Sequence, residues 1–197
     1  MSHYFTNDNV KSEIKVIKSI VKGNEYKFYT DYNVFSKDKI DFGTRLLLES
    51  IENIEGEVLD LGCGYGVIGI YLRNNFNVLV DMIDINNRAI LLCKKNIELY
   101  KLENINVFQS DGYENIFKKY DYIITNPPIR IGKNKLYEIL LNSINYLKDS
   151  GKLIIVIRKE QGAKSLIKEL EKVYFVEIIN KKKGYYILKS TKKQYKI

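Results

Sequence analysis

Short apolar segments alternate with segments of helical periodicity through most of this 197-residue chain. The apolar segments cover residues 57–62, 77–85, 105–111, 120–126 and 151–158. The helical segments cover residues 43–53, 66–75, 87–102, 134–147 and 162–173, with a shorter one at 113–117. Strands that alternate with helices form βαβ units, whose right-handed crossovers place helices on both faces of a parallel sheet. The alternation therefore predicts an α/β protein.

The end of the chain departs from this alternation. Two strand-like segments, YFVEIIN at 174–180 and YYILKS at 185–190, are separated only by KKKG. Because so short a turn cannot join parallel neighbours, these strands are expected to form an antiparallel hairpin. We therefore predict a seven-stranded Rossmann-like sheet that is mostly parallel, with an antiparallel last strand and helices on both faces.

The segment before the first of these strands is expected to cap the ligand-binding edge of the sheet. Residues 10–21 carry apolar side chains at helical spacing, and a short hairpin is expected to turn at residues 31–33. The prediction is one domain over residues 1–197, with the helix and hairpin in 1–50 and the core in 51–197.

A glycine cluster follows the first predicted strand and allows two interpretations. From Gly64, the residues GYGVIG match the dinucleotide fingerprint, whereas from Gly62 the loop is G-x-G-x-G and ends at Gly66. Asp60 favours the second interpretation, because a carboxylate repels a pyrophosphate and attracts an ammonium or sulfonium cation. In that case Gly69 serves to pack its helix against the sheet. A purely structural turn is the remaining alternative.

Two further carboxylates follow the second and third predicted strands. Asp84 comes about 20 residues after the glycine loop, where an acidic residue binds the ribose hydroxyls of an adenosine cofactor. Asp81 is its competitor, although it lies inside the apolar run. Asp111 can accept a hydrogen bond from an adenine amino group. The alternative for Asp111 is the N-cap of the short helix expected at 113–117.

The only two prolines of the chain, Pro127 and Pro128, follow Asn126 at the end of the fourth predicted strand. Proline fixes its own φ and restricts the residue before it, so Asn126 is expected to be extended and rigid. Its amide oxygen and the Pro127 carbonyl would form a pair of acceptors suited to a planar –NH2 group. A turn that merely ends the strand is the alternative.

The composition of the chain argues against several kinds of functional site and limits the expected compartment and partners. One histidine, His3, and two cysteines, Cys63 and Cys93, argue against a metal site, a Ser-His-Asp triad and a disulfide framework. The sequence has no apolar run of membrane-spanning length and no signal-peptide pattern, so we expect a cytoplasmic protein without membrane contact. The net charge of +8 fits either a nucleic-acid partner or a solvated lysine-rich surface. The lysines at 181–183 are candidate nucleic-acid contacts.

The ordered set of strand-end motifs resembles the class I S-adenosylmethionine-dependent methyltransferases. That set comprises Asp60, Gly62, Gly64, Gly66, Asp84, Asp111 and Asn126-Pro127-Pro128. A closer similarity is to the small-domain methyltransferases, which form the catalytic half of RsmC-type 16S rRNA guanine-N2 methyltransferases. It is carried by VFSKDKIDFGTRLLL at 34–48, GVIG at 66–69, NPPIR at 126–130 and KEQGAKSL at 159–166. It covers roughly residues 24–190 and implies the same fold.

The resemblance implies S-adenosylmethionine as the cofactor and assigns residues to it. Asp60 would lie near its amino group, Asp84 would bind the ribose, and Asp111 would face adenine. The full cofactor-binding set would be Asp60, Gly62, Cys63, Gly64, Gly66, Asp84, Ile85, Asp111, Gly112 and Asn126.

The resemblance also implies a substrate site around the catalytic residues Asn126, Pro127 and Pro128. Phe35 and Thr44 would help close this pocket from the N-terminal segment. Ile129 stands where related enzymes carry an aromatic residue that stacks on the target base, so stacking would be weaker or supplied by Phe35. Arg130 would contact phosphate or base, or remain a surface arginine.

The predicted function is methyl transfer to an exocyclic amino group of a base, with guanine N2 in ribosomal RNA as the leading target. The expected partner is 16S rRNA or the small ribosomal subunit. A protein glutamine N-methyltransferase is the main alternative, because a glutamine amide also presents an –NH2 group. A nicotinamide-dependent oxidoreductase and a non-catalytic RNA-binding module are the two others.

Overall fold

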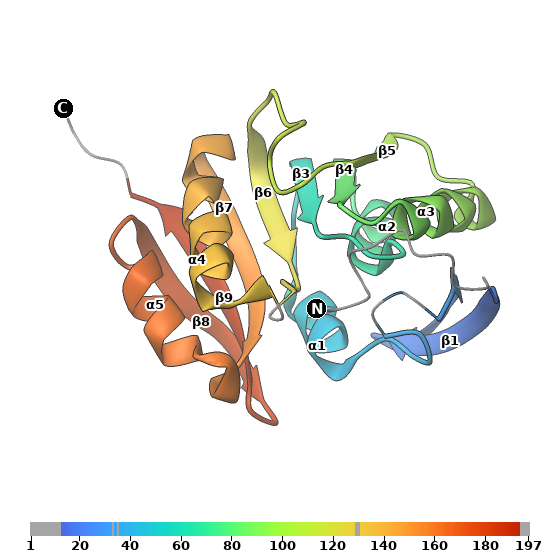
Figure 1. Ribbon diagram of the computed structural model, residues 1–197, viewed down its shortest axis with the longest axis horizontal. Coiled ribbons are helices and arrows are strands. Elements are labelled where there is room, and N and C mark those ends of the chain that lie inside the picture. The colour runs from blue at the N-terminus through green and yellow to red at the C-terminus, as the bar shows by residue number, and fades with distance from the viewer. Residues whose placement is uncertain (1–12, 33, 35, 129–130, 194–197) are drawn as a thin grey trace.

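The computed structural model describes residues 13–32, 34, 36–128 and 131–193, which form two β-sheets (Figure 1). The large sheet has seven strands in the order β5-β4-β3-β6-β7-β9-β8. They are β3 (Gly56–Leu61), β4 (Val78–Asp84), β5 (Ile105–Gln109), β6 (Tyr120–Thr125), β7 (Leu147–Arg158), β8 (Tyr174–Lys182) and β9 (Tyr185–Lys192). Strands β3 to β7 are parallel, and β9 is antiparallel to both β7 and β8. The predicted seven-stranded sheet with a reversed last strand is confirmed.

The direction in which the chain adds strands reverses between β3 and β6. Strands β4 and β5 extend the sheet on one side of β3, whereas β6 and β7 extend it on the other side. The arrowheads of β3, β4 and β6 point to the same edge in Figure 1. Open α/β sheets bind their ligands at this edge, where the loops at the reversal diverge.

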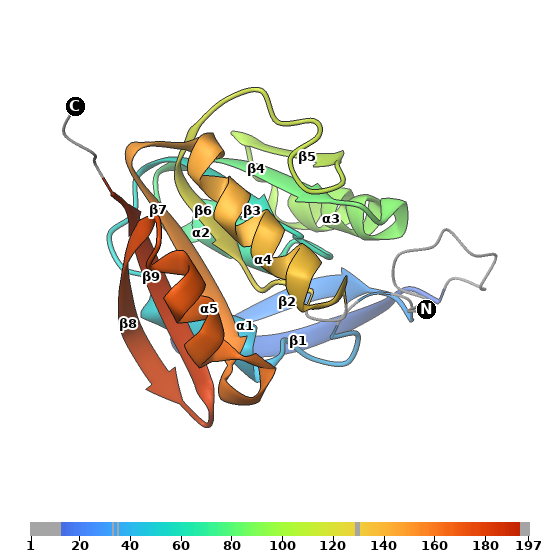
Figure 2. The same cartoon turned by 60° about the vertical axis from the view of Figure 1, so that its left-hand side comes forward.

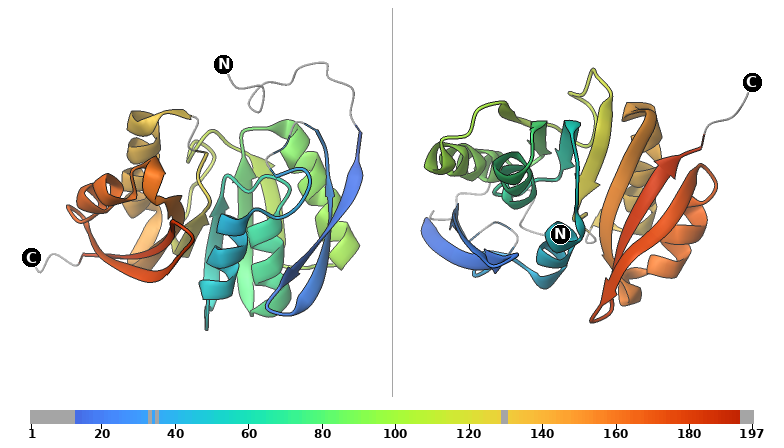
Figure 3. Two further views of the ribbon diagram at one scale, coloured as in Figure 1. Left: turned by 90° about the horizontal axis from the view of Figure 1, so that it is seen from below. Right: turned by 180° about the vertical axis from the view of Figure 1, so that it is seen from behind.

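Helices cover both faces of the large sheet (Figures 2 and 3). The first face carries α1 (Phe42–Ser50), α2 (Val67–Asn75) and α3 (Asn87–Tyr100), together with the small sheet of β1 (Lys15–Val21) and β2 (Asn24–Thr30). The second face carries α4 (Lys133–Asn142) and α5 (Ala163–Leu170), with the 3-10 turns η2 (Ser143–Tyr146) and η3 (Lys159–Gln161). Within the described ranges, no helix is long and apolar enough to cross a membrane.

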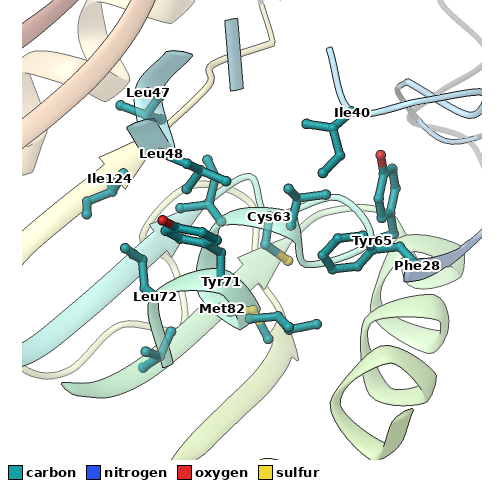
Figure 4. Close-up of a cluster of buried hydrophobic side chains, with 14 of the residues drawn as sticks. Phe28, Ile40, Leu47, Leu48, Cys63, Tyr65, Tyr71, Leu72, Met82 and Ile124 are labelled. Carbon is teal, nitrogen blue, oxygen red and sulfur yellow. The ribbon is translucent and has the colours of Figure 1, made fainter. Parts of the chain in front are cut away.

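Alternate residues of the central strands supply two separate hydrophobic clusters. Val58 of β3 packs into the cluster under α1, α2 and α3, whereas Leu59 packs into the one under α4 and α5. Both side chains are fully buried, which explains why the parallel strands are apolar runs without polar alternation. Figure 4 shows the first cluster, in which Phe28 of β2 lies against Tyr65 with 5.9 Å between ring centroids.

The N-terminal prediction is wrong where the structure describes it. Residues 15–21 form β1 and not a helix, and the hairpin turns at Lys22 and Gly23 instead of at residues 31–33. Ile17 and Val21, both buried, are four residues apart, a spacing that fits a helix face and also one face of a strand. Lys22 and Gly23 have φ values of 47° and 82°, which suit a two-residue hairpin turn.

The short helix expected at 113–117 is also absent from the described structure, where this segment forms turns. Five residues are too few to offset the cost of helix nucleation by themselves. The segment is anchored by its aromatic side chain, because Tyr113 is buried and stacks on Tyr146 with 4.3 Å between ring centroids.

Candidate active site

The strand-end residues singled out in the sequence meet at one edge of the sheet. The glycine loop at 62–66 follows β3, Asp84 ends β4, and Asn126 follows β6. Gly64 N donates to Asp84 Oδ2 at 2.9 Å, which joins the first two. Thr125 Oγ1 donates to the carbonyl oxygen of Leu61 at 2.7 Å, which fixes the end of β6 beside the start of the glycine loop. The fold thus gathers separate motifs into one site.

The glycines of the loop serve different purposes. A Cβ added at Gly66 would lie 2.5 Å from Cys93 Sγ, so packing beneath the loop excludes any side chain there. A Cβ at Gly64 would have no atom within 4 Å, and one at Gly62 would meet only Pro128 Cδ at 4.0 Å. Gly62 and Gly64 therefore leave open space beside the proline pair, into which a ligand can approach the backbone.

Asp60 is a fully buried carboxylate directly beneath this loop. Its Oδ2 accepts a hydrogen bond from Gly69 N at 2.9 Å, whereas its Oδ1 has no partner among the described residues. Burial raises the pKa of Asp60 to about 7, with a smaller contribution from the charge of Asp84. A buried acceptor without a donor is costly, and a cationic ligand group would satisfy it.

Gly69 confirms the packing role expected for it. A Cβ at this position would lie 2.3 Å from Met82 Sδ, so α2 approaches β4 as closely as it does only because Gly69 has no side chain. The same approach brings Gly69 N to Asp60. Because the third glycine of the dinucleotide pattern also packs its helix against a strand, this role fits both interpretations of the glycine loop.

Asp84 links the glycine loop to the turn after β4. Its Oδ2 accepts from Gly64 N, its Oδ1 accepts from Asn86 N at 2.9 Å, and burial raises its pKa. Its competitor, Asp81, lies in a different network, where its oxygens accept from Asn106 Nδ2 at 2.9 Å and Tyr120 Oη at 2.8 Å. Asp84 is therefore the carboxylate that reaches the site.

Asp111 is not a helix N-cap, because no helix follows it. The turn after β5 is instead fixed by Ser110, whose Oγ accepts a hydrogen bond from Asn115 N at 3.1 Å. The Asp111 carboxylate is instead partly exposed and lies 3.6 Å from Lys135 Nζ. Its carboxylate thus remains accessible beyond the end of β5.

Asn126 is held by the N-terminal segment. Its Nδ2 donates to Thr44 Oγ1 at 2.8 Å and makes longer contacts of 3.3 and 3.4 Å with the Asp41 carboxylate. Asp41 is itself the N-cap of α1 and accepts from Thr44 N at 3.0 Å. Because these contacts occupy the amide nitrogen, Oδ1 is the atom left to accept a hydrogen bond from a ligand.

The structure places some predicted substrate residues and leaves others undescribed. Thr44 does belong to the site, through Asn126. Phe35, Ile129 and Arg130 lie outside the described residues. Asp41 was missed in the sequence, although an aspartate before the apolar residues at 46–48 is a typical N-cap signal that marks the start of α1. Nothing in the sequence connects that cap with Asn126.

Comparison with known proteins identifies the family. The methyltransferase small domain matches residues 25–189. The chain is 42% identical over 197 residues to the uncharacterized protein YbxB of Bacillus subtilis, covering 98% of that protein. It is 38% identical over 152 residues to the ribosomal RNA small subunit methyltransferase C of Psychromonas ingrahamii, but covers only 43% of its length. The chain thus spans less than half of that relative.

The fold of this chain is similar to those of solved methyltransferase structures. The Thermus thermophilus 16S rRNA N2 G1207 methyltransferase RsmC, solved with AdoMet and guanosine, has a TM-score of 0.80 and 24% identity, over 94% of this chain and 52% of that one. A methyltransferase from Pyrococcus furiosus has a TM-score of 0.67 and 19% identity, over 75% of this chain and 80% of that one. These findings confirm the resemblance drawn from the motifs and exclude the nicotinamide-dependent interpretation of the glycine loop. The chain belongs to the methyltransferase small-domain family of S-adenosylmethionine-dependent methyltransferases.

Proposed function

We propose that this methyltransferase modifies an exocyclic amino group of a base in ribosomal RNA, with guanine N2 of 16S rRNA as the specific target. The observation that carries the proposal is the arrangement of Asn126, whose amide nitrogen is occupied by Thr44 and whose Oδ1 is left as an acceptor. An acceptor fixed in this way suits the N–H of a planar amine. The small-subunit rRNA methyltransferases among the relatives and the net charge of +8 support RNA as the substrate.

The residues at the site fit S-adenosylmethionine on two observations. The unpaired, buried Oδ1 of Asp60 matches a cationic amino group, and the open space beside Gly62 and Gly64 admits close approach to the backbone. When bound, the cofactor supplies an electrophilic methyl group on a sulfonium, whose loss requires no general acid. The residues proposed to hold it are Asp60, Gly62, Cys63, Gly64, Gly66, Asp84, Ile85, Asp111, Gly112 and Asn126.

The proposed catalytic role of Asn126 is orientation. Its Oδ1 and the carbonyl of Pro127 accept the two N–H groups of the target amine and direct the nitrogen lone pair toward the methyl group. Both oxygens are negative ends of fixed dipoles, so they stabilise the positive charge that develops on nitrogen. The charged nitrogen then loses its proton readily to water, so the site needs no strong base.

The proposal is tested with tritiated S-adenosylmethionine and ribosomes from a strain that lacks the gene. We expect label in 16S rRNA, recovered as N2-methylguanosine after digestion, with wild-type protein and none with Asn126→Ala. As a control, Asn126→Ala is expected to keep most of its affinity for S-adenosylmethionine in calorimetry, although it loses activity. Label that appears in ribosomal protein instead would favour the glutamine alternative and reject RNA as the substrate.

A further inference from the structure

A cluster of aromatic and basic side chains lies next to the site on the same edge of the sheet. The Phe42 cluster, as we call it, consists of Phe42, Arg45, Arg158, Lys183 and Tyr185. It joins α1, the end of β7 and the turn between β8 and β9. Figure 2 shows that turn, the end of β7 and α1 at one end of the molecule.

The two rings form the centre of the cluster. Their centroids are 5.4 Å apart, and both residues are half-buried. Phe42 has Arg45 Cζ at 5.5 Å and Lys183 Nζ at 5.3 Å from its ring centroid. Tyr185 has Arg158 Cζ at 5.1 Å. Cations over aromatic faces keep their N–H donors available, because the ring occupies none of them as a conventional acceptor would.

The cluster is continuous with the residues that hold Asn126. Phe42 lies between Asp41 and Thr44 in the chain, and both of these contact the Asn126 amide. Gly43 completes the link, because a Cβ there would lie 2.7 Å from Tyr185 Cε1. A strand of nucleic acid bound on the cluster would therefore pass directly beside the proposed target-amine site.

The charges of the cluster are weakly neutralised, unlike those at the opposite edge of the sheet. Arg45 and Arg158 each face one glutamate, at 3.8 and 3.6 Å, and Lys183 has no ion pair among the described residues. At the opposite edge, Lys118 and Lys148 each lie within 3.0 Å of two carboxylates. Long, exposed ion pairs contribute little and exchange readily for a phosphate.

We propose that the Phe42 cluster binds a single-stranded segment of RNA next to the target nucleotide. Arg45, Arg158 and Lys183 contact its phosphates, and the exposed parts of the two rings offer a surface for a base. Cations beside aromatic rings suit single-stranded nucleic acid, which carries a negative charge at every phosphate, whereas a peptide loop carries such charge only at acidic side chains. The inference rests on the proposed function, and it adds the surface by which the substrate is held.

The test compares two triple variants that remove the same charge. Arg45→Gln/Arg158→Gln/Lys183→Gln alters the cluster, and Lys94→Gln/Lys95→Gln/Lys119→Gln is the control on α3 and before β6. Affinity for a fluorescently labelled rRNA fragment is measured at several salt concentrations. We expect the cluster variant to weaken binding about tenfold or more, and to reduce the salt slope by about 0.7–0.9 for each phosphate that the variant no longer neutralises. The control variant is expected to change both quantities much less.

Two further measurements distinguish a loss of RNA binding from a loss of folded protein and from a wrong proposed substrate. Phe42→Leu/Tyr185→Leu is expected to weaken RNA binding without changing the salt slope, because it removes rings and no charge. All variants are expected to keep wild-type affinity for S-adenosylmethionine in calorimetry, which verifies that the core is folded. Equal reductions of affinity in the cluster and control triples would overturn the proposal while leaving RNA methylation intact. Methylation of protein with no RNA binding by the wild type would overturn the proposed function itself.

Discussion

The amide nitrogen of Asn126 donates a hydrogen bond to Thr44 Oγ1 at 2.8 Å, although 82 residues separate the two in the chain. The contact couples the N-terminal segment to the proposed catalytic loop. The Asp41 carboxylate beside it selects the orientation of the amide, because a carboxylate only accepts and the Thr44 hydroxyl could also donate. We therefore propose that Thr44 positions Asn126, in addition to the pocket-closing role predicted for it.

Thr44→Val tests this positioning role with a side chain of almost the same shape. Without the hydroxyl, Nδ2 keeps only its longer contacts with Asp41 and the amide is held less firmly, so we expect kcat to fall about 10–100-fold at saturating cofactor. Calorimetry is expected to give an unchanged affinity for S-adenosylmethionine, and Thr44→Ser is expected to restore most of the activity. A Thr44→Val variant with wild-type kcat would show that the hydrogen bond has no part in orienting the substrate.

Asp84 and Asp81 form a natural matched pair for the cofactor. Asp84→Ala is expected to weaken S-adenosylmethionine binding severely, because it removes the proposed ribose acceptor and the partner of Gly64 N. Asp81→Asn is expected to leave cofactor affinity unchanged and to lower the melting temperature, since it weakens the contacts with Lys118 and Tyr120. Calorimetry and thermal unfolding of both variants check the pair, and equal cofactor affinities would contradict the assignment of Asp84.

Alanine substitutions at Gly64 and Gly66 of the glycine loop are expected to have different effects on stability and cofactor binding. Gly66→Ala places a Cβ 2.5 Å from Cys93 Sγ at a φ of 94°, so we expect a large drop in melting temperature. Gly64→Ala meets no atom within 4 Å, so its cost is only that of positive φ, about 1–2 kcal/mol. The added methyl is nevertheless expected to weaken cofactor binding, because it fills space the ligand needs. Unaltered cofactor affinity in a folded Gly64→Ala protein would place the ligand elsewhere.

The raised pKa of Asp60 predicts that the folding stability of the cofactor-free protein depends on pH. Its folded pKa of about 7 lies above the unfolded value of about 3.9, so the folded state binds more protons between these values. The contribution of Asp60 to stability is therefore expected to fall as pH rises from about 4 to about 7, and to stay constant above that range. Chemical denaturation of wild type and Asp60→Asn at several pH values measures it, since the variant lacks this slope.

The same group predicts how cofactor affinity changes with pH. A cationic amino group binds the ionised carboxylate best, so affinity for S-adenosylmethionine is expected to rise as pH increases from about 6 through about 7. Asp60→Asn is expected to bind more weakly and to show no such rise. A pH profile that is the same in both proteins would remove Asp60 from the amino-group site.

Much of this protein follows from its sequence, because the relevant signals are local. The alternation of apolar and helical segments can be recognised without knowing which segments contact each other. It correctly predicted the seven-stranded sheet, the helices on both of its faces and the antiparallel last strand. Parallel strands end at one edge, so Asp84, Asn126 and the glycine loop could be placed together from their positions in the strands alone.

Tertiary structure decided the features that depend on distant partners. Ile17 and Val21 fit either a helix or a strand, and pairing with β2 together with burial on the first face of the large sheet selects the strand. The hydrogen bonds from the Asn126 amide to Asp41 and Thr44 join residues more than 80 positions apart. The contact between Phe42 and Tyr185 joins α1 to the last strand. No local periodicity encodes such contacts, because the chain brings these side chains together only when the sheet has assembled.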